Sequence, residues 1–114
     1  MAATHDAING YAIMWLFVMF DLPTNTAAER KAAARFRKDL IKDGFGMMQF
    51  SVYIRNCASG ESADMHTKRV RMLVPDEGIV SIARITDKQF SDIATITGAK
   101  VRAPPLATVQ LEFF

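Results

Sequence analysis

Hydrophobic residues along this chain fall into short runs separated by polar segments, which is typical of a mixed α and β domain. The most apolar run, residues 13–20, holds eight consecutive hydrophobic residues before Asp21-Leu22-Pro23. Such a run is too short to cross a bilayer and lacks the period of an amphipathic helix. It therefore predicts a strand buried on both faces, with Asp21 at its end, where binding and catalytic groups are commonly placed.

A helix is expected after this strand. Thr26 and Glu29 have the spacing of a capping box, and Gly44 stands where a helix commonly ends. Together they bracket a helix of roughly 17 residues. From Met48 to Ile54, apolar and polar residues alternate, which predicts a strand with one apolar face.

The rest of the chain predicts a second helix, capped by Ser59 or Ser62 and stopped by Pro75, followed by further strands. These strands are expected at residues 79–86, 93–97 and 107–113. A short turn over residues 87–92 is expected between the first two. This order by itself predicts only an α+β domain with helices on a sheet. Because two helices can cover only one face of the sheet, we expect a second copy to pack on the other face in a symmetric homodimer.

Length and composition favour one globular domain in a reducing compartment. The chain has 114 residues, of which 50% are hydrophobic, enough for a single core. Its single cysteine, Cys57, excludes an internal disulfide and a cysteine-based zinc cluster, so we expect a cytoplasmic protein without a membrane span. Residues 1–12 lack a long apolar core, so they are interpreted as a disordered lead rather than a signal peptide.

Positive charge is concentrated on the first predicted helix. Ten of the fourteen Lys and Arg residues lie between Arg30 and Arg71, although the formal net charge is only +2. Four of them fall within one sector of about 60° on a helix, with Arg30 and Arg37 beside it. We call these four the basic stripe: Lys31, Arg35, Lys38 and Lys42. Two interpretations remain open, a solvated helix face and a surface that follows the phosphates of a duplex.

Other residues with reactive side chains give weaker signals. His66 lies among apolar and basic residues, where a partly buried structural histidine is favoured over a metal ligand. Neither His66 nor His5 has a partner at metal-ligand spacing. Cys57 has no nearby base in sequence and is interpreted as a small apolar residue.

Several motifs together resemble a known family. They are Phe20-Asp21-Leu22-Pro23, the basic helix, Gly44-Phe45, the segment from Gln49 to Tyr53, and Gly78-Ile79-Val80. Over residues 13–98 this combination is similar to the CRISPR-associated endonuclease two family, in the versions that accompany single-effector, type II systems. The resemblance implies a ferredoxin-like domain over residues 13–98, with two helices on one face of the sheet and a homodimer on the other.

The resemblance also implies a biological role and partners. Residues 99–114 are expected to form a C-terminal tail whose strand reaches the partner subunit or the CRISPR integrase, CRISPR-associated endonuclease one. The expected function is CRISPR adaptation, in which a basic homodimer binds prespacer duplex DNA and bridges the integrase. The alternative is a toxin-like, metal-dependent ribonuclease that acts on its own.

The resemblance assigns Asp21 the catalytic role. One Asp21 from each subunit is expected to face its twin and to hold Mg²⁺, which prefers oxygen ligands and keeps several waters. The implied activity is magnesium-dependent endonuclease cleavage, and the nucleic-acid-binding residues are Arg30, Arg37 and the basic stripe. Without the resemblance, Asp21 is also compatible with a simple turn-forming role before Pro23.

Overall fold

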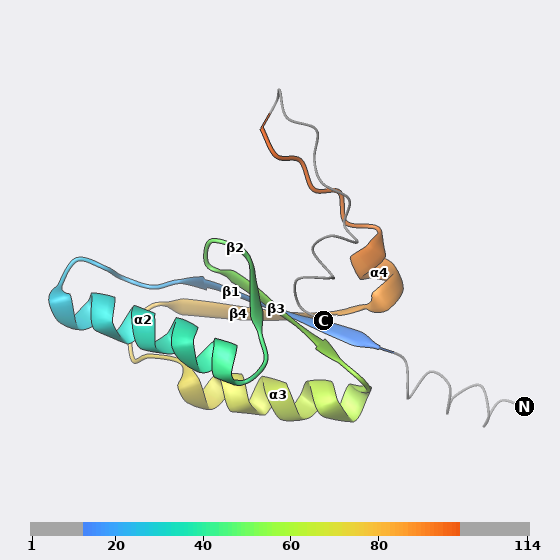
Figure 1. Ribbon diagram of the computed structural model, residues 1–114. Coiled ribbons are helices and arrows are strands. Elements are labelled where there is room, and N and C mark those ends of the chain that lie inside the picture. Colours follow the sequence, from blue (N-terminus) through green and yellow to red (C-terminus); the bar gives the residue numbers. More distant parts are fainter. Residues whose placement is uncertain (1–12, 99–114) are drawn as a thin grey trace, which may run out of the picture.

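The elements of the chain follow the order of a ferredoxin-like α+β fold in the computed structural model, which describes residues 13–98 (Figure 1). They are β1 (Met14–Asp21), α2 (Ala27–Lys42), β2 (Gly46–Gln49), β3 (Val52–Cys57), α3 (Gly60–Leu73), β4 (Ile79–Thr86) and α4 (Asp87–Ser91). The sheet has the order β2-β3-β1-β4, and every neighbouring pair is antiparallel. The predicted fold class is therefore confirmed, whereas the expected lead and tail strand lie outside the described residues.

Strand β1 is central in this sheet, as its unbroken apolar run predicts. It pairs with β3 along one edge and with β4 along the other, so Phe17 lies between Ile54 and Ala83. Because side chains alternate along a strand, Leu16, Val18 and Phe20 point to one face and Trp15 and Phe17 to the other. The two sets belong to two separate hydrophobic clusters.

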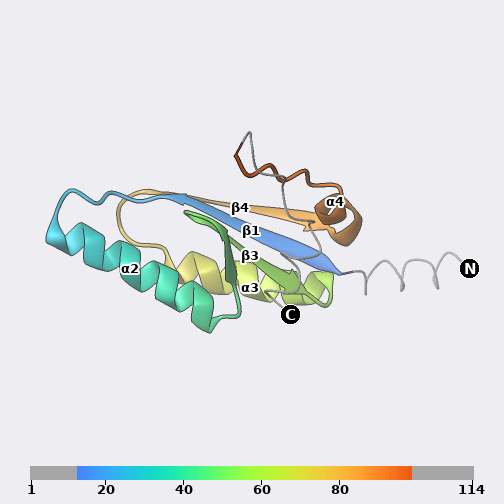
Figure 2. The same cartoon turned by 45° about the horizontal axis from the view of Figure 1, so that its top comes forward.

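Helices α2 and α3 cover one face of the sheet, and α4 lies on the other side (Figure 2). The larger cluster joins β1 to Phe36 and Leu40 of α2 and to Ala63 and Val70 of α3, all nearly inaccessible to solvent. None of the helices within residues 13–98 is long and apolar enough to span a membrane.

The expected limits of α2 are confirmed by its caps. The Thr26 hydroxyl accepts a hydrogen bond from the Glu29 backbone N–H at 3.1 Å, and the Glu29 carboxylate accepts one from the Thr26 N–H at 2.9 Å. Beyond the last turn, Gly44 has φ of +91° and donates its N–H to the Ile41 carbonyl. This left-handed conformation favours glycine, which explains why the helix ends there.

The predicted single strand over residues 48–54 is wrong, because the structure has a hairpin there. Strand β2 ends at Gln49 and β3 begins at Val52, with the turn at Phe50 and Ser51. Ser51 adopts φ of +64°, and its carbonyl accepts a hydrogen bond from the Phe20 N–H at 3.0 Å. This bond attaches the turn to β1. The sequence does not indicate the turn, because the alternation of apolar and polar residues continues across it.

The predicted turn at residues 87–92 and the strand at 93–97 are also wrong. A capping box between Thr86 and Gln89 begins α4. The chain therefore stops pairing with the sheet at Thr86, and α4 packs on the second sheet face. Residues 93–97 form no strand. Ile93 packs instead beside the second cluster, because α4 carries it to the face that Trp15 occupies.

The contact between Trp15 and Phe90 attaches α4 to the second face of the sheet. Their rings stack with centroids 3.8 Å apart and planes inclined by 7°, and both side chains are fully buried. The Trp15 indole N–H also donates to the Asp87 carboxylate at 2.8 Å. Part of the face that we expected a partner copy to cover is thus covered by the chain itself.

Replacing Phe90 with alanine should detach α4 from the sheet. Loss of a fully buried Phe side chain is expected to lower the free energy of unfolding by about 3–5 kcal/mol. Trp15 is the only tryptophan of the chain, so its emission should shift to the red in the same variant. Urea denaturation followed by circular dichroism and fluorescence measures both effects. The exposed Ser91→Ala variant on the same helix is the control, and unchanged Trp15 emission in Phe90→Ala would contradict the stacking.

Candidate metal and nucleic-acid site

Asp21 is the last residue of β1, and its side chain is exposed. It lies opposite Ile79 in β4, and alternation along the strand places it on the same face as Phe17 and Met19, away from α2 and α3. The preceding apolar residues are buried or half-buried. The carboxylate therefore stands where the buried strand first reaches solvent, as the sequence predicts.

Gly78 fixes the backbone beside Asp21. Its φ is +107°, and a Cβ atom added there would lie 2.9 Å from the Asp21 carbonyl oxygen and 2.6 Å from Leu22 Cδ2. Only glycine permits this approach without displacement of the neighbouring chain. Because residue 78 has no side chain, the start of β4 can pack directly against the end of β1.

A shallow hollow opens beside the carboxylate. Its lining includes Asp21, the turn residues Phe50 and Ser51, and the β4 residues Ile79 and Ser81. The polar side chains of this lining are one carboxylate and two hydroxyls. Within the described part of the chain, no three His, Cys, Asp or Glu side chains gather as a metal site.

This donor set fits magnesium only in part. Mg²⁺ prefers oxygen ligands, retains several waters and is commonly bound through one or two carboxylates together with substrate phosphates. Among residues 13–98, the lining of this hollow offers one carboxylate, that of Asp21, which is exposed to solvent. The site fits the ion when a phosphate or a second copy of the chain supplies further oxygens.

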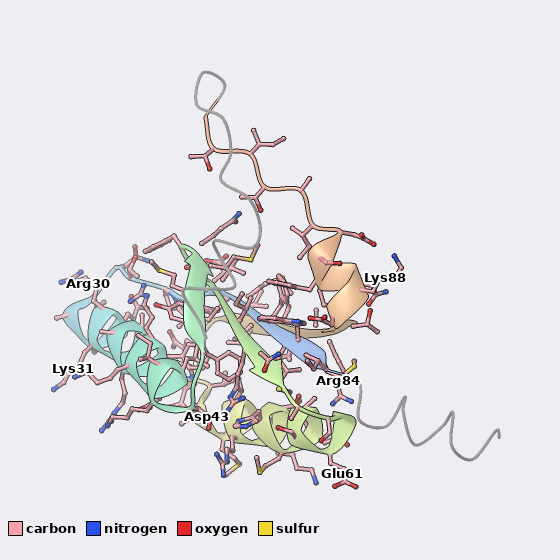
Figure 3. The ribbon with its side chains drawn as sticks, turned by 45° about the vertical axis from the view of Figure 1, so that its right-hand side comes forward. Arg30, Lys31, Asp43, Glu61, Arg84 and Lys88 are labelled. Carbon is pink, nitrogen blue, oxygen red and sulfur yellow. The ribbon has the colours of Figure 1, made fainter. Side chains whose placement is uncertain are left out.

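The basic stripe lies on the solvent face of α2, opposite Phe36 and Leu40. All four of its cations are exposed, and none forms an ion pair within residues 13–98. Arg30 is exposed beside the stripe and donates hydrogen bonds to the carbonyls of Thr24 and Asn25, at the N-terminal end of the helix. Figure 3 shows Arg30 and Lys31 projecting outward from this end.

Arg37 differs from the other cations of the helix. It is half-buried, and its guanidinium lies over the Phe50 ring, 5.4 Å from the ring centroid. The helix is thereby connected to the turn that lines the Asp21 hollow. Phe50 was not identified as a site residue from the sequence, because the alternation of apolar and polar residues around it predicts a place on the apolar face of a strand.

The structural interpretation of His66 is confirmed. His66 is buried, and its Nδ1 atom lies 2.7 Å from an Asp43 carboxylate oxygen. The other Asp43 oxygen accepts a hydrogen bond from Arg69 at 2.9 Å. These contacts join the end of α2 to α3, and Asp43 lies between the two helices in Figure 3.

Cys57 is also a structural residue. Its side chain is fully buried in the larger cluster, and burial raises the pKa of its thiol. Because a raised pKa leaves less thiolate at neutral pH, Cys57 is a poor nucleophile there. The sequence interpretation of Cys57 as a small apolar residue agrees with this position.

Fold and site together define a class of protein: a small ferredoxin-like α+β domain with a strand-end carboxylate and an exposed row of cations on one helix. Residues 14–93 match the family model described as CRISPR associated protein Cas2, and the chain belongs to this family. The resemblance seen in the sequence motifs is thus confirmed.

Curated relatives match nearly the whole chain. A protein of Flavobacterium psychrophilum is 49% identical over 110 residues, covering 96% of each chain. One from Parvibaculum lavamentivorans is 52% identical over 101 residues, covering 89% of this chain and 100% of the relative. A third, from Paracidovorax avenae, is 42% identical over 107 residues, covering 94% and 99%. All three relatives carry the name CRISPR-associated endoribonuclease Cas2.

A methyl group at Gly78 should disturb the position of Asp21. Gly78→Ala forces a left-handed backbone on a residue with a Cβ atom, which costs about 1–2 kcal/mol before the contacts with Asp21 and Leu22 are counted. We expect the free energy of unfolding to fall by at least that amount in a urea titration. Gly60→Ala is the matched control, since an added Cβ there meets no atom within 4 Å. Equal stability of the two variants would show that the close approach at Gly78 is not a constraint.

Proposed function

We propose that this protein is a CRISPR adaptation subunit: a basic homodimer that binds prespacer duplex DNA and bridges the CRISPR integrase, CRISPR-associated endonuclease one. We further propose that Asp21 supports magnesium-dependent cleavage of phosphodiesters. The observation that carries the proposal is the exposed basic stripe on a member of the Cas2 family. Its cations are available to phosphates because none is neutralised by an acidic neighbour among the described residues.

The second sheet face supports the proposed homodimer. Helix α4 covers the end of this face at Trp15, whereas the opposite end keeps Ile79 68% exposed and Phe50 78% exposed. Apolar area of this kind is a common site of association. A second copy seated at this end brings the two Asp21 carboxylates toward each other, as the proposed metal site requires.

Asp21 is the proposed metal ligand of each protomer. A bound magnesium ion would supply Lewis-acid activation of water and would offset negative charge on the phosphate. The protein contributes the carboxylate, which β1 and Gly78 hold in place. Exposure of the site leaves room for a phosphate to approach.

The alternative function is a metal-dependent ribonuclease that acts on its own. It is favoured by the names of the curated relatives, which are called endoribonucleases. Both functions use Asp21, but only the adaptor requires binding to duplex DNA. Spacer acquisition by an Asp21→Asn variant separates them: acquisition that persists after cleavage is lost selects the adaptor.

The basic stripe should control DNA affinity without sequence preference. Replacing Lys31, Arg35, Lys38 and Lys42 with glutamine should weaken duplex binding to all sequences alike, because contacts to phosphate carry no base information. The slope of log affinity against log salt should also flatten by about 0.9 for each phosphate that the protein no longer neutralises. Fluorescence anisotropy titrations between low and moderate salt measure both quantities.

A matched control removes exposed cations elsewhere in the protein. Lys68, Arg71 and Lys88 lie on α3 and α4, outside the basic stripe, and their replacement with glutamine should change affinity much less per charge. An equal loss per charge in both sets would assign DNA binding to net charge alone. An unchanged salt slope in the stripe variant would mean that the stripe is a solvated helix face.

Magnesium should stabilise the wild type through Asp21. Two carboxylates brought together in a dimer repel, and a divalent cation between them relieves this repulsion. Added Mg²⁺ should therefore raise the melting temperature of the wild type, whereas Asp21→Asn should melt at the same or a higher temperature without metal and gain little from it. Any magnesium-dependent cleavage should be lost in the same variant.

The outcomes of this experiment separate the parts of the proposal. Equal magnesium shifts in wild type and Asp21→Asn would exclude Asp21 as the ligand. Light scattering on the same samples tests the dimer, and a monomer at micromolar concentration would remove the paired geometry. DNA binding by the stripe would survive either result.

A further inference from the structure

A groove lies beside the first half of α2, on the side of the sheet that α2 and α3 cover. Its volume is about 410 Å³, and it is bounded by α2, by the segment that leads from β1 to α2 and by the loop between α3 and β4 (Figure 1). Leu22 belongs to this lining and packs against the larger cluster. The groove is therefore separate from the Asp21 hollow and from the sheet face on which a second copy is proposed to pack.

Most of the lining of this groove is apolar. These residues are Leu22, Pro23, Ala28, Ala32, Ala33 and Pro75. The two prolines have a fixed φ, and the capping box at Thr26 holds the start of α2. The close approach of Gly78 to Leu22 holds the loop between α3 and β4 against the end of β1. Because these walls are fixed before any partner arrives, binding costs little ordering of the groove.

The remaining lining of the groove is mainly acidic. It consists of Thr26, Glu29, Asp76 and Glu77, and it contains no Lys or Arg. Asp76 and Glu77 are exposed, and neither forms an ion pair within residues 13–98. The Glu29 carboxylate accepts two backbone N–H bonds through Oε1, while its Oε2 atom makes no hydrogen bond among the described residues. The groove thus has a negative rim that no described neighbour neutralises.

An apolar floor with a negative rim selects one kind of ligand. Carboxylates repel the phosphates of nucleic acid, so the groove differs in this respect from the basic stripe on the neighbouring sector of α2. These carboxylates do not gather as a metal site within the part of the chain that the structure describes. An arginine or lysine side chain matches both features, because its alkyl stem packs on apolar surface while its charged head reaches a carboxylate.

We propose that this groove binds an extended segment of a partner protein in which arginine or lysine residues alternate with apolar residues. The apolar side chains of the segment pack on Ala28 and Ala32, and its cations pair with Asp76 and Glu77. Helix α2 then has two partners of different kinds, since the basic stripe contacts phosphate and the adjacent sector contacts protein. The inference depends neither on DNA binding by the stripe nor on cleavage at Asp21.

Peptide titrations followed by heteronuclear NMR test the inference and locate the bound peptide. The probe is a synthetic octapeptide of alternating arginine and leucine, added to the full-length protein without nucleic acid. The amide signals of Ala28, Ala32 and Glu77 should shift, whereas those of Lys38 and Lys42 in the basic stripe should not. Peptides with glutamate in place of arginine, or with glycine in place of leucine, should bind much more weakly.

Matched variants separate the contributions of charge and shape. Asp76→Asn combined with Glu77→Gln should weaken peptide binding by about 2- to 30-fold, the range expected for the loss of two exposed ion pairs. Glu61→Gln removes an exposed carboxylate of α3 outside the groove and should leave the affinity unchanged. Ala28→Trp fills the groove and should abolish binding, whereas Ala34→Trp, at an exposed position of the same helix outside the lining, should not.

Several results would overturn the inference. Equal affinity of Ala28→Trp and the wild type, or shifts centred outside the lining, would place the peptide elsewhere. Equal affinity for the glycine-substituted peptide would reduce the interaction to net charge. A DNA duplex that shifts the Glu77 amide signal as the peptide does would make nucleic acid the occupant.

The peptide-free protein tests the two remaining occupants. A change of oligomeric state in Ala28→Trp, measured by light scattering, would mean that a second copy fills the groove. Shifts in the amide signals of residues 1–12 or 99–114 in the same variant would mean that an end of the chain itself fills it. Either result would replace the proposed partner segment.

Discussion

Strand β1 is the constraint on which the other elements depend, because both of its edges and both of its faces are occupied. Its backbone pairs with β3 and β4, while its side chains enter one cluster with α2 and α3 and another with α4. A charged group inside this strand would be buried without a partner, at high energetic cost. The end of the strand is the first position that tolerates a carboxylate, so the burial of β1 also explains why Asp21 lies at its end.

The polar junction at Asp43 explains why the basic stripe stays uncompensated. Asp43 follows the last turn of α2, and its carboxylate points toward α3, where His66 and Arg69 bind it. Its backbone carbonyl also accepts a hydrogen bond from Arg55 of β3 at 2.8 Å. Because this carboxylate is engaged between the helices and half-buried, it is not available to neutralise Lys42 or Lys38. The contact that attaches α2 to α3 thus leaves the outer face of α2 positively charged.

The elements that could be predicted from the sequence are those with local signals. The capping box at Thr26, the glycine at position 44 and the apolar run of β1 each act within a few residues, and the structure agrees with all three. The β2–β3 hairpin could not be predicted, since its turn uses Phe50 and Ser51 rather than glycine or asparagine. The same turn hides the exposed aromatic ring from sequence analysis, because its position depends on Arg37 of a different element.

Helix α4 was not predicted, although its capping box is present in the sequence at Thr86 and Gln89, because the residues that follow it have the composition of a strand. The residues beyond it, at 93–97, are rich in β-branched side chains, as in a strand. Ile93 packs instead beside Trp15 and Phe90 on the second face of the sheet, and Ile96 is left exposed. This choice matters for the proposed assembly. With the Trp15 end covered in part by α4, the end that carries Asp21 keeps the exposed apolar side chains of Ile79 and Phe50. Under the proposed function, each protomer then carries a complete row of cations for phosphate but only one carboxylate of the proposed pair, so phosphate contacts are present on each chain whereas metal-dependent cleavage needs the dimer.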